Sequence, residues 1–197
     1  MRTERTERAD KPVEANETRK AGKATKKIAV TGRPGVGKTT LCLRIFESLS
    51  GRAEIDGFIT REVREGGRRI GFRVVDLRSG ESFWLARKGV EKPVTVGSYA
   101  VMLDEFEDYI SQRFNELRGD LIIVDEVGPM ELKSRVFVRK VEELIASGKN
   151  LLFTIHYKSR HPLLERIRRE FEVYEITLEN RDRLAEEILN RIQEAIL

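Results

Sequence analysis

The chain has 197 residues, of which 36% are charged and 40% hydrophobic, and its formal net charge at pH 7 is +4. This length suits one domain with a substantial core, and no apolar run approaches the ~20 residues of a membrane span. A single cysteine excludes an internal disulfide framework. Since the N-terminus also lacks an apolar segment, we expect a cytoplasmic protein.

Residues 1–27 form a charged segment with almost no apolar content. They hold nine Lys or Arg and five Asp or Glu, so they carry the whole positive surplus of the chain. This composition predicts a disordered extension. It would be either an inert tail or a weak nucleic-acid-binding arm, and we favour the inert tail. Residues 28–197 are charge-balanced and are expected to form a single domain.

A glycine-rich loop follows the first apolar run. Residues 28–31 suit a buried strand, and residues 32–39 match the pattern G-x-x-x-x-G-K-[ST] at every fixed position. Cys42, Ile45 and Leu49 then share one face of a helix, where we interpret Cys42 as a core residue and not as a nucleophile. Strand, loop and helix therefore occur in the order that a phosphate-binding loop requires.

The residue types of this loop predict how it holds a polyphosphate. Glycines let the backbone turn several amide N–H groups toward one point, and the Lys38 ammonium and the start of the helix add positive charge there. The Thr39 hydroxyl would bind Mg²⁺. We assign nucleotide binding to Gly32, Arg33, Pro34, Gly35, Val36, Gly37, Lys38, Thr39 and Thr40.

Residues 57–86 differ from the rest of the chain. Three short strand-like runs are separated by Gly66-Gly67 and Ser79-Gly80, which predicts an antiparallel meander inserted after the first helix. Residues 93–101 are expected to be a loop or an edge strand.

The remaining elements alternate. We predict helices with apolar faces at 103–117, ended by Gly119, at 137–145, ended by Gly148, from Pro162 onward, and at 184–192. Asn180 is interpreted as the N-cap of the last helix, and the alternative is that its loop contacts the nucleobase. Apolar strands are predicted at 121–124, 151–155 and 171–176. Strands alternating with helices indicate an α/β fold with a mostly parallel sheet covered by helices on both faces.

Two acids end the apolar strand at 121–124. Because desolvating adjacent carboxylates is costly, Asp125 and Glu126 at this place indicate a function. Asp125 would hold Mg²⁺, and Glu126 would orient and deprotonate an attacking water. We therefore assign a second nucleotide-binding segment to Leu121, Ile122, Ile123, Val124, Asp125, Glu126, Val127 and Gly128. No N-K-x-D motif is present, which argues against a guanine-specific switch.

Charge that develops in the transition state needs a cation beyond Lys38 and Mg²⁺. The meander and the loop after residues 151–155 offer seven basic residues, of which we select Arg64 and Arg160 as catalytic together with Lys38 and Glu126. His156 and Thr154 compete as sensors of the γ-phosphate, and His161 is expected at a helix start.

At this point several motifs converge. Five motifs occur along the chain in a fixed order: G-R-P-G-V-G-K-T-T, G-F-I-T-R-E-V-R, R-I-G-F, V-D-E-V-G-P-M-E-L and E-N-R-D. Over roughly residues 27–197 the chain resembles the thermophile nucleoside-triphosphatase family, whose animal members are called cancer-related nucleoside-triphosphatases. The resemblance implies a RecA-like P-loop NTPase fold with an added antiparallel portion. It also implies Mg²⁺-dependent hydrolysis of ATP, GTP and other nucleoside triphosphates to diphosphate and phosphate.

The predicted function is therefore nucleoside-triphosphate hydrolysis with Mg²⁺ as cofactor. Broad base tolerance is expected because phosphate contacts do not read the base. A nucleotide or nucleoside kinase is one alternative, with its acceptor on the arginine-rich meander. A nucleotide-regulated RNA-binding protein, with RNA engaged by residues 1–27, is the other, although nucleic acid is not a favoured partner and no membrane contact is expected.

Overall fold

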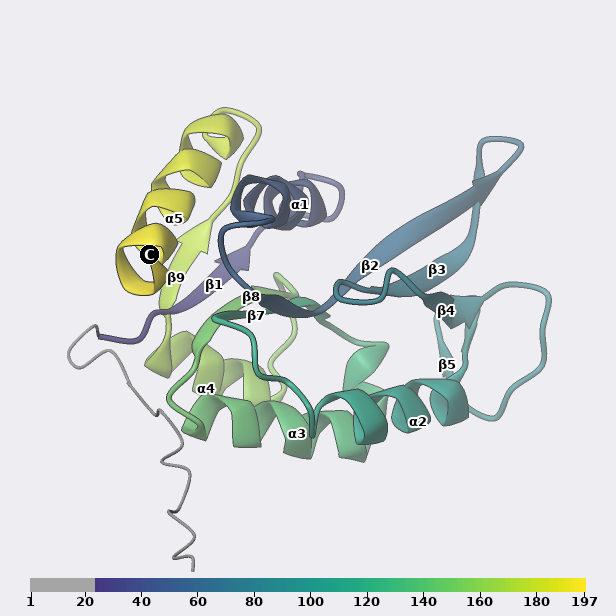
Figure 1. Cartoon of the computed structure of the whole chain (residues 1–197). Coiled ribbons are helices and arrows are strands. Elements are labelled where there is room, and N and C mark those ends of the chain that lie inside the picture. Colours follow the sequence, from purple (N-terminus) through teal and green to yellow (C-terminus); the bar gives the residue numbers. More distant parts are fainter. Residues whose placement is uncertain (1–23) are drawn as a thin grey trace, which may run out of the picture.

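A computed structural model describes residues 24–197, which are built around one mixed β-sheet (Figure 1). In these residues the nine strands lie in the order β5-β6-β4-β3-β2-β7-β8-β1-β9. Their bounds are β1 (Lys27–Thr31), β2 (Ile55–Glu65), β3 (Arg68–Asp76), β4 (Ser82–Arg87), β5 (Thr95–Val96), β6 (Tyr99–Val101), β7 (Leu121–Val127), β8 (Asn150–Ile155) and β9 (Glu172–Glu175).

The sheet changes from parallel to antiparallel at β2. The strands β2, β7, β8, β1 and β9 pair in parallel, whereas β3, β4, β6 and β5 continue the sheet in antiparallel pairs. The predicted meander is thus present, and its first strand also belongs to the parallel sheet through the pairing of residues 55–59 with β7. The register places Ile59 beside Asp125, so the next residues of β2 start at the end of β7.

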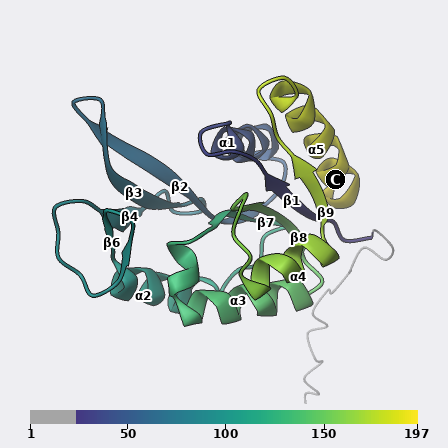
Figure 2. The ribbon, with the colours of Figure 1, turned by 180° about the vertical axis from the view of Figure 1, so that it is seen from behind.

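Helices cover both faces of the sheet, as the alternating pattern predicts (Figures 1 and 2). Their bounds are α1 (Lys38–Leu49), α2 (Leu103–Arg113), α3 (Arg135–Ala146), α4 (Pro162–Glu170) and α5 (Arg181–Ile196), with a short 3₁₀ turn at Glu131–Lys133. Helices α1 and α5 lie together on one face, and α2, α3 and α4 lie on the other. The α/β fold class with an antiparallel meander is confirmed.

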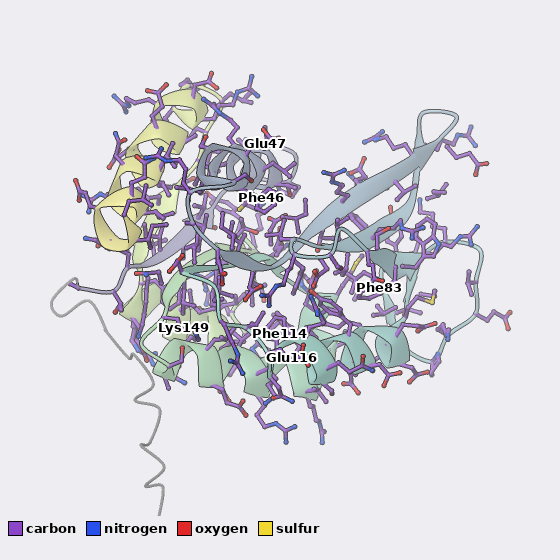
Figure 3. All side chains as sticks on the ribbon, in the orientation of Figure 1. Phe46, Glu47, Phe83, Phe114, Glu116 and Lys149 are labelled. Carbon is purple, nitrogen blue, oxygen red and sulfur yellow. The ribbon has the colours of Figure 1, made fainter. Side chains whose placement is uncertain are left out.

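Each face of the sheet has its own apolar core. Alternate residues of β7 serve the two cores: Ile122 and Val124 face α2–α4, whereas Leu121 and Ile123 face α1 and α5. A strand buried on both faces needs an unbroken apolar run, which explains its sequence. Figure 3 shows side chains filling both layers, with Phe114 between the sheet and α3.

The single cysteine lies in the core beneath α1. Cys42 is fully buried, and burial raises the pKa of its thiol well above the ordinary value. A thiol held in its neutral form is a poor nucleophile. The interpretation of Cys42 as a core residue is confirmed.

The helix predicted at 103–117 ends earlier than expected, at Arg113. The chain then turns so that the backbone N–H groups of Arg118 and Gly119 donate to the buried Asp56 carboxylate, at 2.7 and 2.8 Å. A Cβ on Gly119 would lie 2.9 Å from the backbone N of Asp56. Gly119 is therefore needed for close backbone packing, and its assignment as a helix terminator was wrong.

The β2–β3 hairpin reaches beyond the helices, and we call its residues 60–74 the arm (Figure 1). At its base, Gly57 has φ +106°, and a Cβ there would lie 1.9 Å from the carbonyl oxygen of Ile123. Asp76 is the last residue of β3, and its carboxylate accepts hydrogen bonds from the Tyr109 hydroxyl and from Arg113, both in α2. The arm is therefore anchored at a fixed angle to the parallel sheet.

The hypothesis about residues 1–27 lies almost wholly outside the described residues, so the extension and the single-domain boundary remain predictions. Among residues 24–197, no helix has both the length and the apolar character that a membrane crossing requires.

Candidate nucleotide-binding site

The glycine loop joins the end of β1 to the start of α1. Gly35 and Gly37 have φ of +78° and +115°, which only glycine adopts without strain. Gly32 lies against Ile176, since a Cβ would come within 2.6 Å of the Ile176 carbonyl oxygen. Lys38 is 8% exposed, and its side chain folds back to donate to the Gly32 carbonyl at 3.3 Å. The loop thus has the conformation that a phosphate cradle needs.

Asp125 meets this loop from the end of β7. The Thr39 hydroxyl donates to one of its carboxylate oxygens at 2.7 Å, and the Thr154 hydroxyl donates to the other at 2.5 Å. The Thr60 backbone N–H lies 3.4 Å from the same oxygen as Thr39. Asp125 is 1% exposed, and burial raises the pKa of its carboxyl to about 6, against the opposing effect of the two hydroxyl donors. Three elements therefore converge on one carboxylate.

Glu126 faces the phosphate loop beside Asp125, and the peptide bond between the two is cis. Its carboxylate lies 3.5 Å from the Lys38 ammonium. A second carboxyl group, that of Glu131, approaches the same place: a Cβ on Gly128 would lie 2.7 Å from Glu126 Oε1 and 3.1 Å from Glu131 Oε2. Gly128 thus leaves room for both carboxyl groups.

Glu131 is 4% exposed, and burial together with the nearby charge of Glu126 raises its pKa to about 8. At neutral pH this carboxyl group is mostly protonated. Glu126, in contrast, is only partly buried and opens into the cavity. The two neighbouring acids therefore differ in environment, since Glu131 is buried and Glu126 lines the cavity.

These groups line a cavity of about 740 Å³ between the phosphate loop and the arm. Its loop half contains Gly32, Pro34, Gly35, Gly37, Lys38, Thr39, Thr40, Leu43, Asp125, Glu126, Pro129, Met130, Glu131, His156 and Tyr157. Its other half, the arm half, contains Thr60, Arg61, Glu62, Arg69 and Phe72 of the arm together with Val96, Gly97 and Tyr99 of the β5–β6 hairpin. The cavity is larger than a triphosphate alone requires.

The structure brings together most of the predicted phosphate-loop residues but not all of them. Arg33 is exposed and Val36 is buried in the α1 core, and neither lines the cavity. Residues 121–124 and Val127 are buried in the sheet. Their contribution is to position Asp125 and Glu126, which do face the cavity.

The two selected arginines lie away from the cavity. Arg64 is exposed, pairs with Glu62 and donates to the Gly67 carbonyl at 2.9 Å near the tip of the arm. Arg160 is exposed on the loop after β8. Arg61 and Arg69 line the cavity instead. Arg61 directly follows Thr60 in β2, and its side chain lines the same cavity as Asp125.

The histidines and Asn180 have local structural roles. Thr154, not His156, contacts Asp125, and the His156 ring accepts from the backbone N–H groups of Lys158 and Ser159. His161 caps α4 by accepting from Leu163 N–H, as predicted. Asn180 is the N-cap residue of α5, as predicted, but its side chain makes no cap bond to the helix. Its amide group bonds to Thr177 N–H and to the Glu175 carbonyl instead.

Four site residues escaped the sequence analysis: Thr60, Glu131, and the two arginines that line the cavity, Arg61 and Arg69. Thr60 uses a backbone N–H, which no side-chain pattern reports. The two arginines were among five in the meander, and only the folded hairpin shows which of the five face the cavity. Glu131 did carry a signal, because an acid between Met130 and Leu132 in the block V-D-E-V-G-P-M-E-L sits in an apolar context.

Comparison with known proteins identifies the family of this chain. A family model described as NTPase matches residues 27–189. The chain belongs to this nucleoside-triphosphatase family. Nucleoside-triphosphatase THEP1 of Archaeoglobus fulgidus is 59% identical over 162 residues, which cover 82% of this chain and 96% of that relative.

Two solved structures agree with the family assignment. The crystal structure of THEP1 from the hyperthermophile Aquifex aeolicus matches with a TM-score of 0.74 and 35% identity, covering 84% of this chain and 98% of that one. The solution structure of a human cancer-related nucleoside triphosphatase matches with a TM-score of 0.74 and 38% identity, covering 87% and 99%. The resemblance to this family and the predicted P-loop NTPase fold are confirmed.

Proposed function

We propose that this chain hydrolyses nucleoside triphosphates to diphosphate and phosphate, with Mg²⁺ as cofactor and with little discrimination between bases. The observation that carries the proposal is the approach of the β7 acids to the phosphate loop, with Thr39 and Asp125 at 2.7 Å and Lys38 and Glu126 at 3.5 Å. Membership of the nucleoside-triphosphatase family supports it.

The residues present fit a magnesium ion. A hydroxyl and a carboxylate already in contact are hard oxygen ligands, and Mg²⁺ takes its other ligands from phosphate oxygens and water. The protein's share of the site would be Thr39 and Asp125. When bound, the ion would neutralise phosphate charge and orient the β- and γ-phosphates.

Each side chain then has a distinct task. Lys38 and the loop amides bind the β- and γ-phosphates, and on nucleotide binding the Lys38 ammonium exchanges its Gly32 contact for phosphate oxygens. Glu126 orients a water for in-line attack on the γ-phosphorus and accepts its proton as the bridging oxygen leaves with the diphosphate. Arg61 supplies positive charge from the arm side as charge develops on the γ-phosphoryl group.

Glu126→Gln tests this proposal. The amide preserves shape but cannot accept the proton, so we expect phosphate release at saturating ATP and Mg²⁺ to fall by about 10²–10⁴-fold while nucleotide affinity is kept. Glu47→Gln on the exposed face of α1 is the matched control and should turn over like the wild type. Near-normal release by Glu126→Gln would show that another group prepares the water.

A nucleotide or nucleoside kinase is the second candidate, favoured by the arm half of the cavity. There Phe72 and Tyr99 form an edge-to-face pair at 5.3 Å, and Arg69 lies over Phe72 at 5.4 Å. Such a surface has room for a base and charge for a phosphate. Labelled ATP offered with nucleosides and nucleoside monophosphates decides between the two, since transfer faster than phosphate release would favour the kinase.

A further inference from the structure

The antiparallel part of the sheet has one face that no helix covers in the part of the chain that the structure describes. Helices α1 and α5 lie over the parallel strands, and α2 lies against the other face of the antiparallel part (Figures 1 and 2). Val74 of β3 and Leu85 of β4 are buried in the core toward α2. Because side chains alternate along a strand, their neighbours Arg73 and Trp84 point to the uncovered face.

A row of large polar and aromatic side chains crosses this face. The strand register pairs Arg61 of β2 with Arg73 of β3, and Arg73 with Trp84 of β4. The register of β3 with β4 then shifts by one residue, so that Arg87 pairs with Gly71 and lies beside Trp84. Three arginines and the single tryptophan of the chain are therefore gathered on one face of the sheet.

The Trp84 ring and two guanidinium groups form one stacked unit. The Cζ atoms of Arg73 and Arg87 lie 5.3 and 4.9 Å from the ring centroid of the indole. Gly71 makes room for the indole, since a Cβ there would lie 2.9 Å from Trp84 Cζ3. The Arg73 guanidinium also donates to the Ser82 carbonyl at 2.7 Å, which fixes its position. The face therefore presents planar, positively charged groups that are already held in place.

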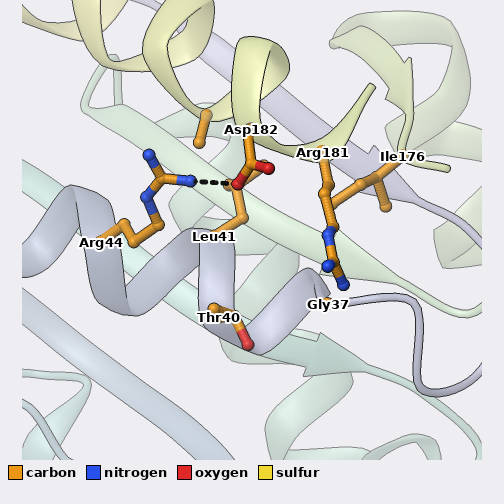
Figure 4. Close-up of a pocket in the computed structure, with 8 residues that line it drawn as sticks. Gly37, Thr40, Leu41, Arg44, Ile176, Arg181 and Asp182 are labelled. Atoms are coloured by element: carbon orange, nitrogen blue, oxygen red, sulfur yellow. Dashed lines mark hydrogen bonds and ion pairs between the residues drawn. The ribbon is translucent and has the colours of Figure 1, made fainter. Parts of the chain in front are cut away.

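The positive charge of this face is not neutralised within residues 24–197. There, none of Arg61, Arg73 and Arg87 forms an ion pair with a carboxylate. Exposed arginines elsewhere do so, as Arg44 does with Asp182 at 2.8 Å between α1 and α5 (Figure 4). The three guanidinium groups are therefore available to an anionic ligand.

The helix on the opposite side of this part of the sheet is acidic. Asp104, Glu105 and Asp108 are exposed on α2. Residues 28–197 are charge-balanced as a whole, and this balance hides a difference in sign between the two sides. A polyanion is attracted to the uncovered face and repelled by the α2 side, so the charge pattern selects one face for binding.

We propose that the uncovered face, which we call the Trp84 face (Arg61, Arg73, Trp84 and Arg87), binds a single strand of nucleic acid. Bases stack on Trp84 and on the guanidinium planes beside it, while the arginine N–H groups bind phosphates. A single strand fits because its bases are free to stack, whereas duplex bases are already stacked on one another. Arg61 also lines the phosphate cavity, so the strand would lie next to a bound nucleotide.

The single tryptophan gives this proposal a direct test, because its fluorescence reports the Trp84 face alone. The full chain is titrated with oligouridylate, oligothymidylate, a DNA duplex of the same length and polyglutamate. RNA and DNA share the proposed chemistry, and the two single strands show which is preferred. We expect both to quench the Trp84 emission with an affinity that falls as salt rises. The duplex and polyglutamate should bind more weakly and quench little.

Variants separate stacking from charge, with binding measured by the anisotropy of a labelled strand. Trp84→Leu should weaken binding by about 5- to 100-fold, and Trp84→Phe should retain most of it. Arg87→Ala should weaken binding by about 2- to 10-fold and reduce the slope of log affinity against log salt by about 0.7. Arg139→Ala, which removes the same charge from the exposed surface of α3, is the matched control and should bind like the wild type. A cooperative thermal transition shows that each variant folds.

Four outcomes would overturn the inference. Absence of binding would remove it outright. Binding without quenching, or equal binding by Trp84→Leu and the wild type, would place the strand elsewhere on the chain, with residues 1–27 as the alternative. Equal affinity for polyglutamate would make this face a docking site for an acidic protein, and equal affinity for the duplex would remove base stacking. Trp84 and Arg87 lie outside the lining of the phosphate cavity, so none of these outcomes affects the proposed hydrolysis.

Discussion

The carboxyl group of Glu131 is buried beside Glu126, and this position controls how it titrates. Its pKa is about 8 in the folded protein against 4.5 for an ordinary Glu. Between these pH values the folded protein holds a proton that the unfolded chain releases, so the free energy of unfolding falls as the pH rises from about 4.5 through 8. The contribution of Glu131 to stability is complete below this window and lost above it.

Glu131→Gln removes this titration while keeping the shape of the side chain. We expect the unfolding free energy of the variant to depend less on pH between 6 and 8 than that of the wild type, by up to about 1.4 kcal/mol per pH unit. Urea unfolding at several pH values, without nucleotide, measures the difference. Parallel pH profiles for the two proteins would mean that Glu131 is ionised in the fold.

Some residues of the candidate site can be predicted from the sequence, whereas others can be found only in the folded structure. Lys38, Thr39, Asp125 and Glu126 were predicted because each has a fixed place in a motif or at a strand end. Selecting Arg61 over Arg64 required the alignment of β2 with β7, since both arginines lie in the same charged run. A local pattern carries no information about a pairing made between distant segments.

At the scale of the elements, the base of the arm requires glycine at position 57. Gly57 needs both a positive φ and the absence of a Cβ, because the Ile123 backbone lies directly against it. Gly80 has a similar φ, +73°, but no atom lies within 4 Å of the site of its Cβ. The two glycines therefore separate backbone strain from steric overlap.

We expect Gly57→Ala to cost about 3 kcal/mol or more of unfolding free energy, because β2 must shift from β7 to admit the methyl group. Gly80→Ala should cost only about 1–2 kcal/mol, the price of a left-handed non-glycine residue. Chemical denaturation of both variants measures this. Similar losses for the two would show that β2 moves freely at its junction with β7.

Most elements were predictable, because strands buried on both faces and amphipathic helices have distinct periods. The exceptions have physical causes at particular places. Helix α2 ends early because Asp56 takes the following N–H groups, and β2 belongs to both parts of the sheet because its residues 55–59 pair with β7 while residues 58–65 pair with β3, and Gly57 lets its backbone pack directly against Ile123. Both causes are contacts between segments far apart in sequence.

At the scale of the whole molecule, the site joins elements that lie far apart in the sequence. A bound Mg²⁺–nucleotide would contact the α1 layer through Thr39 and the central sheet through Asp125. It should therefore stabilise the protein as a unit. At a nucleotide concentration of 100 times the dissociation constant the gain is about 2.7 kcal/mol.

Thermal unfolding with a non-hydrolysable triphosphate analogue tests this coupling. We expect a higher melting temperature with Mg²⁺ and analogue together, and loss of most of that increase on chelation. Thr39→Val should lose the Mg²⁺-dependent part, whereas Thr39→Ser, which keeps the hydroxyl, should retain it. If the increase in melting temperature survives both chelation and Thr39→Val, the bound nucleotide does not need a cation at this site.

The position of β8 affects when the site can form during synthesis on the ribosome. The glycine loop and the acidic pair are both translated before β8, yet in the finished sheet this strand lies between β1 and β7. A nascent chain that stops before Asn150 already has its main phosphate-binding and cation-binding side chains, but it lacks the strand that spaces them and the Thr154 hydroxyl that holds Asp125. We therefore expect nascent chains that stop before Asn150 not to retain Mg²⁺–nucleotide, and chains that include β8 and the following elements to retain it, which nucleotide-affinity capture of stalled chains measures.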